Sequence, residues 1–392
     1  MSNPLPLTDS KRLPWIDSAR GFAILGIFLV NLASFHGPYF LYGNGQNYWG
    51  LGDPGIIQML LDIFFQASFY SLFSFLFGFG MYMIYDNLSA KQVESPRKWM
   101  VRRLIILLII GAIHAFVIWY GDILITYALV GLLLLLFLTR KNITLWVWFA
   151  CLLVIPVLML TGLLFLTSLV ADTSSLANTA AINQALQHYG EGSITAIWQQ
   201  NATDWFYSNN VLNFFMITCN LLPIFLLGVL FGRNRWLHDI TAHRKILQRW
   251  WVGSLFVFAV CKAGPYLIGN PFWLQMVQDT LGGTGSAIFY LLTITLWYNK
   301  AVKLFRWLGY VGKMALSNYL LQSVLGVLLF YSYGLGLYDT LTPFQTILVG
   351  LIIYPIQVLV SFWWLRYYQR GPIEWLWRSL IYQKKLSNKR AL

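Results

Sequence analysis

The stretch that decides the fold is residues 103–138, RLIILLIIGAIHAFVIWYGDILITYALVGLLLLLFL. Its flanks are almost entirely Leu, Ile and Val, and the pattern predicts two membrane helices that fold back on each other at Gly121 and Asp122. An ionisable group at membrane depth costs roughly 2.5–3.5 kcal/mol on insertion scales and normally faces a cavity or a partner. His114 and Asp122 are therefore the first candidates for chemistry.

The composition of the whole chain is that of a membrane protein. Its 392 residues are 58% hydrophobic and 10% charged, with a mean hydropathy of +0.61, whereas soluble domains carry about 25% charged residues. The cysteines Cys151, Cys219 and Cys261 lie in apolar segments without the spacing of metal ligands, so we expect no metal site. The sequence indicates an all-α, polytopic membrane protein that forms one transmembrane domain over residues 1–392.

A membrane span needs about 20 apolar residues. We therefore expect about ten transmembrane helices, near residues 17–35, 62–86, 103–120, 122–139, 144–169, 209–232, 250–268, 274–298, 313–333 and 345–367. Of the 27 Lys and Arg residues, 26 fall at one set of alternating span ends and in the tail; Lys262 is the exception. The positive-inside rule then predicts a multi-pass protein of the cell (inner or plasma) membrane with both termini in the cytoplasm. The charge suits anionic lipid headgroups, and we expect no nucleic-acid partner.

Two segments outside the spans carry predictions of their own. Residues 170–208, on the outer side, contain no Lys or Arg, and we expect short helices near 175–188 and 194–206. This segment is either a lid over an extracytoplasmic site or an interfacial loop without a function. Residues 371–392 begin with Gly-Pro, which restarts a helix, and are predicted to form a cytoplasmic interfacial helix and a basic tail.

The first span begins with charged residues at the cytoplasmic boundary. Asp17 and Arg20 are three residues apart and share a helix face, so they can pair, and Arg12 precedes them. Two guanidinium groups at the start of a helix can bind phosphate. The alternative is an ion pair that only anchors the topology. Asn31 lies about 16 Å further along the helix axis.

Five segments together resemble one protein family. They are IDSARGFA at 16–23, FSFLFG at 73–78, GAIHAFVIWYGDILITYA at 111–128, GKMALSNYLLQS at 312–323 and GPIEWLWR at 371–378. These motifs are similar to those of the YeiB-like family of bacterial inner-membrane proteins of unknown function. That family in turn resembles the transmembrane acyltransferase and heparan-α-glucosaminide N-acetyltransferase superfamily. The resemblance implies transfer of an acyl group from cytoplasmic acyl-CoA, as co-substrate, to a small-molecule acceptor on the outer side.

One position departs from the acyltransferase pattern. In the bacterial sugar O-acyltransferase branch a catalytic histidine stands where this chain has Asn31, and an amide cannot act as a general base. The N-acetyltransferase branch also has asparagine there and works with a histidine further along the outer side. His36 or His114 could take that role, and His114 lies in a motif of the YeiB-like family. Imidazole exchanges protons near neutral pH, so we expect catalysis by His114 with Asp122.

A direct bond between His114 and Asp122 would require the turn at Gly121 to fold the carboxylate back. The alternative for His114 is a buried histidine bonded to neighbouring helices. Asn318 and Gln322 share one face of the ninth span and either bind substrate or join helices by hydrogen bonds. We assign substrate binding to the residues Arg12, Asp17, Arg20, Asn31, His36, Asn318, Gln322 and Lys262.

Lys262 has two interpretations, because its ammonium group either extends to the outer surface or contributes a cation to a pocket. Ionisable residues within spans, such as Asp62, His114 and Lys262, also mark transport paths. The alternative function is therefore transport, or the handling of lipids or small molecules without acyl transfer. The sequence shows no inverted repeat or paired broken helices, which speaks against a secondary transporter.

Overall fold

The computed structural model describes residues 12–43, 55–170 and 177–390. Within these residues the chain forms helices and no β-sheet, apart from an isolated bridge between Tyr368 and Lys389. Eight described helices are long and apolar enough to cross a membrane, and a ninth span is counted if the bent pair α13–α14 is taken as one. The prediction of an all-α, polytopic membrane protein is confirmed.

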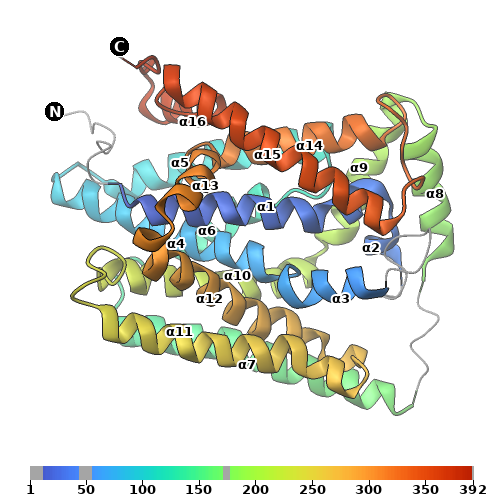
Figure 1. The fold of residues 1–392 in the computed structure, drawn as a ribbon, viewed down its shortest axis with the longest axis horizontal. Coiled ribbons are helices and arrows are strands. Elements are labelled where there is room, and N and C mark those ends of the chain that lie inside the picture. The colour runs from blue at the N-terminus through green and yellow to red at the C-terminus, as the bar shows by residue number, and fades with distance from the viewer. Residues whose placement is uncertain (1–11, 44–54, 171–176, 391–392) are drawn as a thin grey trace.

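Most helices run along one axis, with both chain ends at one end of the bundle and α2, α8 and α9 at the other (Figure 1). The helices that belong to the spans are, in chain order, α1 (Pro14–His36), α3 (Gly55–Phe64), α4 (Ser68–Ala90), α5 (Pro96–Ile113), α6 (Leu124–Leu134), α7 (Asn142–Ser168), α10 (Val211–Arg233), α11 (Arg244–Phe258), α12 (Gly283–Trp297), α13 (Val302–Lys313), α14 (Ala315–Phe330) and α15 (Pro343–Tyr367). The helices outside the spans are α2 (Tyr39–Tyr42), α8 (Thr179–Gly190), α9 (Ile194–Ser208) and α16 (Pro372–Tyr382).

Several spans are not continuous α-helices, although no paired broken helices were recognised in the sequence. The second span breaks between α3 and α4, where Ala67 has a φ of 60°. Wider π-helical turns occur at η2 (His114–Ile118), η4 (Ala259–Ala263) and η7 (Val277–Gly282). In the ninth span α13 and α14 meet at an angle of 78°. The fourth is a short helix of 11 residues. π-Turns inside helices frequently occur at functional sites.

The α1–α13 crossing is a backbone-to-backbone contact. A Cβ atom added at Gly312 would overlap the carbonyl oxygen of Asp17, and one added at Gly21 would overlap that of Leu308. Close approach through small residues is the usual way in which membrane helices associate, because lipid provides no hydrophobic drive between them. The crossing holds the charged start of α1 against the bend between α13 and α14.

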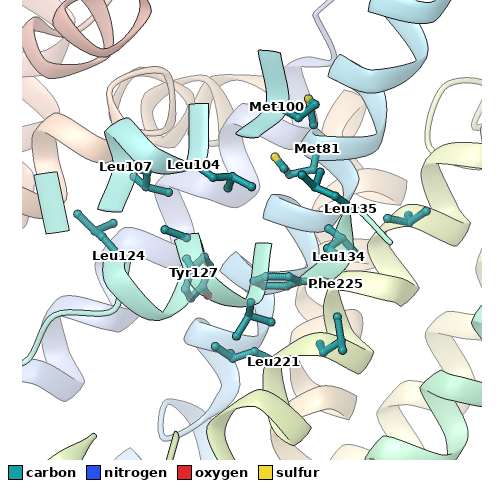
Figure 2. Packing of buried hydrophobic residues seen from close by; sticks show 14 of the residues in the cluster. Met81, Met100, Leu104, Leu107, Leu124, Tyr127, Leu134, Leu135, Leu221 and Phe225 are labelled. Atoms are coloured by element: carbon teal, nitrogen blue, oxygen red, sulfur yellow. The ribbon is translucent and has the colours of Figure 1, made fainter. Parts of the chain in front are cut away.

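The core that positions α5 and α6 lies between them and the helices α4 and α10. Figure 2 shows leucines of α5 and α6 packed against Leu221 and Phe225 of α10 and Met81 of α4. Tyr127 is the polar member of this group, and its hydroxyl bonds with Ser74 Oγ at 2.6 Å. The two helices of the predicted hairpin are thus packed along their length, which fixes the turn between them.

The basic loops meet at the end of the bundle that carries the termini. Arg233, at the end of α10, donates to the carbonyl oxygens of Leu138 and Arg140 at 2.9 and 2.6 Å. At the other end, the amide of Ser332 donates to the carbonyl oxygen of Tyr189 at 2.9 Å. The charge pattern and the chain topology therefore agree. The cytoplasmic assignment of the basic end stays a prediction.

Both segments predicted outside the spans contain helices. Helices α8 and α9 cover most of 177–208; the predicted start of the first at residue 175 lies outside the described residues. Helix α16 follows the Gly-Pro signal, with Gly371 as its N-cap. Most of residues 177–208 are thus helical, and the role of segment 170–208 as a lid stays a prediction.

Candidate functional site

The turn between α5 and α6 brings His114 and Asp122 into direct contact. Helix α5 widens into the π-turn η2 at His114, and the chain is extended at Trp119 before α6 begins. His114 Nδ1 lies 2.8 Å from Asp122 Oδ1, and both side chains are fully buried. The second carboxylate oxygen accepts the amide of Ile125 at 2.7 Å. Asp122 thereby binds a free N–H group at the start of α6, which fixes its position.

The contact determines which nitrogen of His114 is available for chemistry. A carboxylate accepts hydrogen bonds and does not donate them, so a neutral His114 ring that is bonded to the Asp122 carboxylate carries its hydrogen on Nδ1 and presents a lone pair on Nε2. Among the described residues, Nε2 has no hydrogen-bond partner, although it is buried. Buried polar atoms are nearly always paired. Within the described chain Nε2 is therefore available to a bound molecule or to water, and a carboxylate-oriented imidazole with a free Nε2 is the arrangement of a general base.

Aromatic rings enclose the pair His114 and Asp122, which we call the dyad. The centroid of Tyr319, on α14, lies 5.2 Å from the ring of His114, and that of Trp119 lies 6.3 Å away. Phe35 packs on Trp119 at 4.1 Å. Trp119 Nε1, a hydrogen-bond donor, is a second buried polar atom without a partner among the described residues. The surroundings exclude water, and such a low-dielectric site strengthens electrostatic interactions within it.

Helix α9 is docked on the segment that carries His114. The indole of Trp198 donates to the carbonyl oxygen of Val117 at 3.0 Å, and the amide of Asn201 to that of Ile118 at 3.4 Å. These carbonyls are exposed because α5 ends here, and the last carbonyls of a helix need outside donors. Helix α9 thus lies directly against the end of η2.

A buried carboxylate, Asp204, fastens α9 to its neighbours. It accepts hydrogen bonds from Tyr42 on α2, from Tyr189 on α8 at 2.8 Å and from Gln200 at 2.7 Å. Burial raises the pKa of Asp204, while the hydrogen bonds from Tyr42 and Tyr189 act in the opposite direction. The lid is therefore held by a polar network at its base.

The charged start of α1 lies at the opposite end of the bundle. Arg20 Nη1 is 3.5 Å from Asp17 Oδ1, as the spacing predicts, and the Arg20 side chain is 33% exposed. The other oxygen of Asp17 is buried without a partner among the described residues. Arg12 precedes α1 and is half-buried. The structure does not bring these three residues to the dyad.

The polar residues of the ninth span are mainly bonded to protein. The amide of Asn318 donates to the carbonyl oxygens of Val311 and Met314 and to Ser361 Oγ, at 3.0–3.3 Å. It therefore closes the bend between α13 and α14 and links α14 to α15. Gln322 donates to Gln357 Oε1 at 2.9 Å, but its own Oε1 is buried without a partner in the described chain. Gln322 thus keeps an acceptor for a ligand.

Two other candidates lie apart from the dyad. His36 Nε2 accepts the amide of Leu341 at 3.1 Å, and its ring packs edge-on against Phe330. This histidine ties the end of α1 to the loop before α15. Asn31 is half-buried and has no hydrogen bond to the dyad. Of the two histidines considered for catalysis, His114 is the one paired with a carboxylate.

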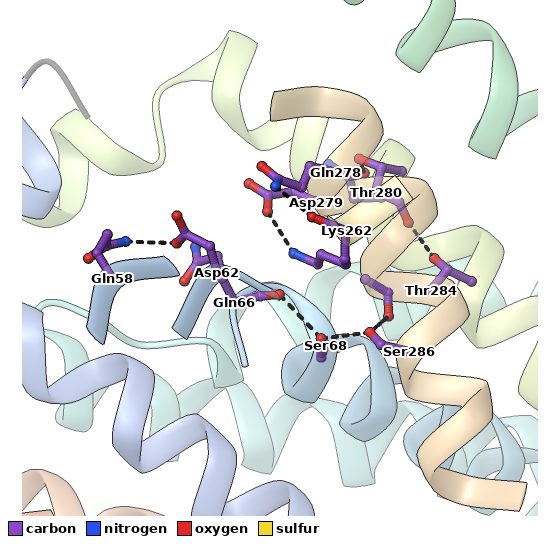
Figure 3. Close-up of polar contacts among 12 residues, drawn as sticks. Gln58, Asp62, Gln66, Ser68, Lys262, Gln278, Asp279, Thr280, Thr284 and Ser286 are labelled. Carbon is purple, nitrogen blue, oxygen red and sulfur yellow. Dashed lines mark hydrogen bonds and ion pairs between the residues drawn. The ribbon is translucent and has the colours of Figure 1, made fainter. Parts of the chain in front are cut away.

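Lys262 is buried and paired, so its predicted extension to the surface is wrong. Its side chain is 0% exposed, and Nζ lies 3.2 Å from Asp279 Oδ1. Figure 3 shows this pair next to Asp62, which accepts from Gln58 at 2.7 Å. The hydroxyl of Tyr266 donates to the other oxygen of Asp62 at 2.8 Å.

Sequence reasoning missed Asp279 as the partner of Lys262. The available signal was a carboxylate in the span that follows Lys262, since two opposite charges within neighbouring spans usually pair. Reasoning from the sequence also treated Arg103 and Arg378 only as topology signals. No sequence pattern links them, because they are far apart in the chain.

Comparisons with known proteins give relatives over almost the full length. The family described as "Protein of unknown function (DUF418)" matches residues 231–384. The chain is 36% identical to "Uncharacterized protein YxaH" of Bacillus subtilis (strain 168), with 97% of each chain covered. It is 29% identical to "Uncharacterized protein YeiB" of Escherichia coli (strain K12), over 93% of this chain and 95% of the relative. These names state no activity.

Proposed function

We infer the function from one premise: the chain belongs to the YeiB-like family of uncharacterised membrane proteins. We propose that it is a membrane acyltransferase, which moves an acyl group from cytoplasmic acyl-CoA to an acceptor on the outer side. The observation that carries this proposal is the unpartnered Nε2 of His114, oriented by Asp122 in a buried site below the lid.

In the proposed reaction His114 acts as the general base. Nε2 takes the proton of an acceptor hydroxyl or amine, whose oxygen or nitrogen attacks the carbonyl carbon of the thioester. The carbon–sulfur bond then breaks, and the imidazolium returns the proton to the departing thiolate. The products are the acylated acceptor and free CoA. Asp122 stabilises the imidazolium by its bond to Nδ1, as the aspartate of a Ser-His-Asp triad does.

Four further residues take binding roles in this scheme. Arg12 and Arg20, at the basic end of the bundle, would attract the phosphates of the donor. The free Oε1 of Gln322 would accept a hydrogen bond from the substrate. Trp119 Nε1, also unpartnered in the described chain, is a donor close to His114. An acceptor would reach this group from beneath α9.

The proposal is tested by incubating the purified protein in lipid nanodiscs with labelled acetyl-CoA and a membrane and periplasmic extract. We expect release of free CoA thiol in step with transfer of the label to one component of the extract. The matched control is the same preparation heated to unfold the protein. If neither thiol release nor label transfer exceeds this control with short and long acyl chains, the protein is not an acyltransferase for these donors.

A second candidate function, transport, is favoured by the surroundings of Lys262. Three spans depart from the α-helix here: the α3–α4 break, η4 and η7. A Cβ at Gly282 would lie 2.9 Å from Lys262 Cγ, and one at Gly283 2.9 Å from Ala67 Cβ, so the broken segments touch. Broken helices with buried charges are common at transporter ion sites.

Transport predicts a defined result for the Lys262–Asp279 pair. Lys262→Met alone leaves a carboxylate without its cation and should destabilise the protein by about 3–5 kcal/mol. The double variant Lys262→Met/Asp279→Leu removes both charges and should recover most of that stability. If the pair serves transport, this folded double variant should lose ion flux in dye-loaded vesicles while His114→Ala retains it. Equal flux in all variants and in empty vesicles would remove transport as a candidate.

A further inference from the structure

A cleft between α5 and α16 contains two arginines. It lies at the basic end of the bundle and has an empty volume of about 570 Å³, open solvent included. Arg103 and Arg378 line it together with Asn87, Trp99, Tyr382 and aliphatic side chains. Both arginines are half-buried. The cleft therefore combines two cations, polar side chains and an apolar wall.

Within the part of the chain that the structure describes, the N–H groups of both guanidiniums are without a hydrogen-bond acceptor. Among the described residues, Arg103 and Arg378 form no side-chain hydrogen bond or ion pair. Arg103 is nevertheless held in place: its guanidinium stacks on Trp377 at 3.8 Å, and the Trp377 indole donates to its carbonyl oxygen at 3.1 Å. A guanidinium carries five N–H donors and no acceptor. Two such groups on one cleft are therefore available to donate to an anion that enters it.

Three carboxylates near this end of the bundle are bonded to groups other than the cleft arginines. Glu374 accepts the amides of Leu316 and Ser317 at 2.7 and 3.1 Å and the hydroxyl of Ser317. It thereby caps the start of α14. Asp17 pairs with Arg20 at 3.5 Å, and Asp86, on α4, pairs with Arg235 at 3.6 Å. None of these three carboxylates forms an ion pair with Arg103 or Arg378.

Burial and the neighbouring positive charges both disfavour the charged form of Arg378. Burial, followed by the charges of Arg370 and Arg12, lowers the pKa of Arg378 to about 10, and Tyr382 and Glu374 act in the opposite direction. Neighbouring cations thus outweigh the local carboxylate. A bound anion would relieve this repulsion.

We propose that Arg103 and Arg378 form a binding site for a phosphate ester. Guanidinium groups match phosphate oxygens with paired hydrogen bonds, and the stacking on Trp377 leaves the edge of Arg103 available. This inference deepens the proposed function, because Arg103 lies about three turns of α5, roughly 16 Å, from His114. A phosphorylated donor held here would direct its reactive end along α5 towards the dyad.

Phosphate esters at this position have two sources, a soluble molecule and a lipid headgroup, and the test separates them. The full-length protein is placed in neutral-lipid nanodiscs, and binding of inorganic pyrophosphate, CoA and phosphate-free pantetheine is measured by calorimetry. A second set of nanodiscs contains phosphatidic acid, and the thermal shift relative to neutral lipid is recorded. Binding of pyrophosphate and CoA but not pantetheine assigns a soluble ester. A shift with phosphatidic acid alone assigns a lipid headgroup.

The variant Arg103→Gln/Arg378→Gln should weaken binding at least tenfold for the ligand that the wild type binds, whether this is the soluble ester or phosphatidic acid. Its charge-matched control is Lys303→Gln/Arg306→Gln, on α13, where both side chains are exposed; this control should stay within twofold of the wild type. Arg103→Lys/Arg378→Lys keeps the charge without the paired geometry and should bind with intermediate strength. A folded Gln variant that binds as tightly as the wild type, or no response in either arm, overturns the site.

The proposed phosphate site and the proposed acyltransferase activity can be rejected independently of each other. His114→Ala should retain phosphate binding in full, because the dyad lies about 16 Å away along α5. Binding that persists in a protein without acyl transfer would support the site and reject the enzyme. If the folded Arg103→Gln/Arg378→Gln variant transfers acyl groups with the wild-type affinity for the donor, the enzyme is supported and the phosphate site is rejected.

Discussion

Replacing His114 by alanine should lower the rate of acyl transfer by about 10²–10⁴-fold, the usual contribution of a general base. The loss should appear in the rate at saturating donor, because the phosphate-binding end of the bundle is unchanged. Asp122→Asn should cause a comparable loss. Its amide can donate to Nδ1, which moves the imidazole hydrogen to Nε2 and removes the lone pair that the reaction needs.

The matched control for this experiment is His36→Ala. His36 is also fully buried, but its Nε2 is occupied by the amide of Leu341. Its replacement should lower thermal stability and leave the rate per folded molecule within a few-fold of the wild type. Rates are measured as CoA thiol release from nanodisc-embedded protein. If His36→Ala abolishes transfer and His114→Ala does not, the dyad is structural and the catalytic assignment is wrong.

Gly312→Ala should destabilise the protein at or above the upper end of the roughly 1–3 kcal/mol typical of overpacking. The added methyl group meets the carbonyl oxygen of Asp17, and a backbone atom cannot rotate away as a side chain can. Helices α1 and α13 would have to separate, which would also disturb the neighbouring contact at Gly21. The expected observation is a lowered midpoint of thermal unfolding in detergent, with early aggregation.

Gly162→Ala is the matched control for this substitution. Gly162 lies in the apolar helix α7, and an added Cβ there would meet nothing within 4 Å. Alanine is favoured over glycine in a helix by up to about 1 kcal/mol, so this variant should be unchanged or slightly more stable. Equal midpoints for Gly312→Ala and the wild type would show that the α1–α13 crossing is looser than the structure indicates.

Local properties of the sequence were sufficient to predict the class of protein and the approximate spans. A membrane span is defined by its own run of apolar residues, and orientation by the charges beside it. His114 and Asp122 could be identified from the sequence for the same reason, because an ionisable group within an apolar run is costly wherever its partner lies. Helices α8, α9 and α16 also follow signals within their own segments.

The tertiary structure alone decided which of these groups meet. Asp122 reaches His114 because α5 widens into a π-turn and the chain folds back at Trp119; hydropathy does not register a π-turn. Lys262 pairs with Asp279 across two broken spans. Arg103 and Arg378 share a cleft only because α16 packs on α5. Hydropathy measures the free energy of transferring each residue into lipid. Contacts between spans depend instead on helix breaks and close packing, which hydropathy does not describe.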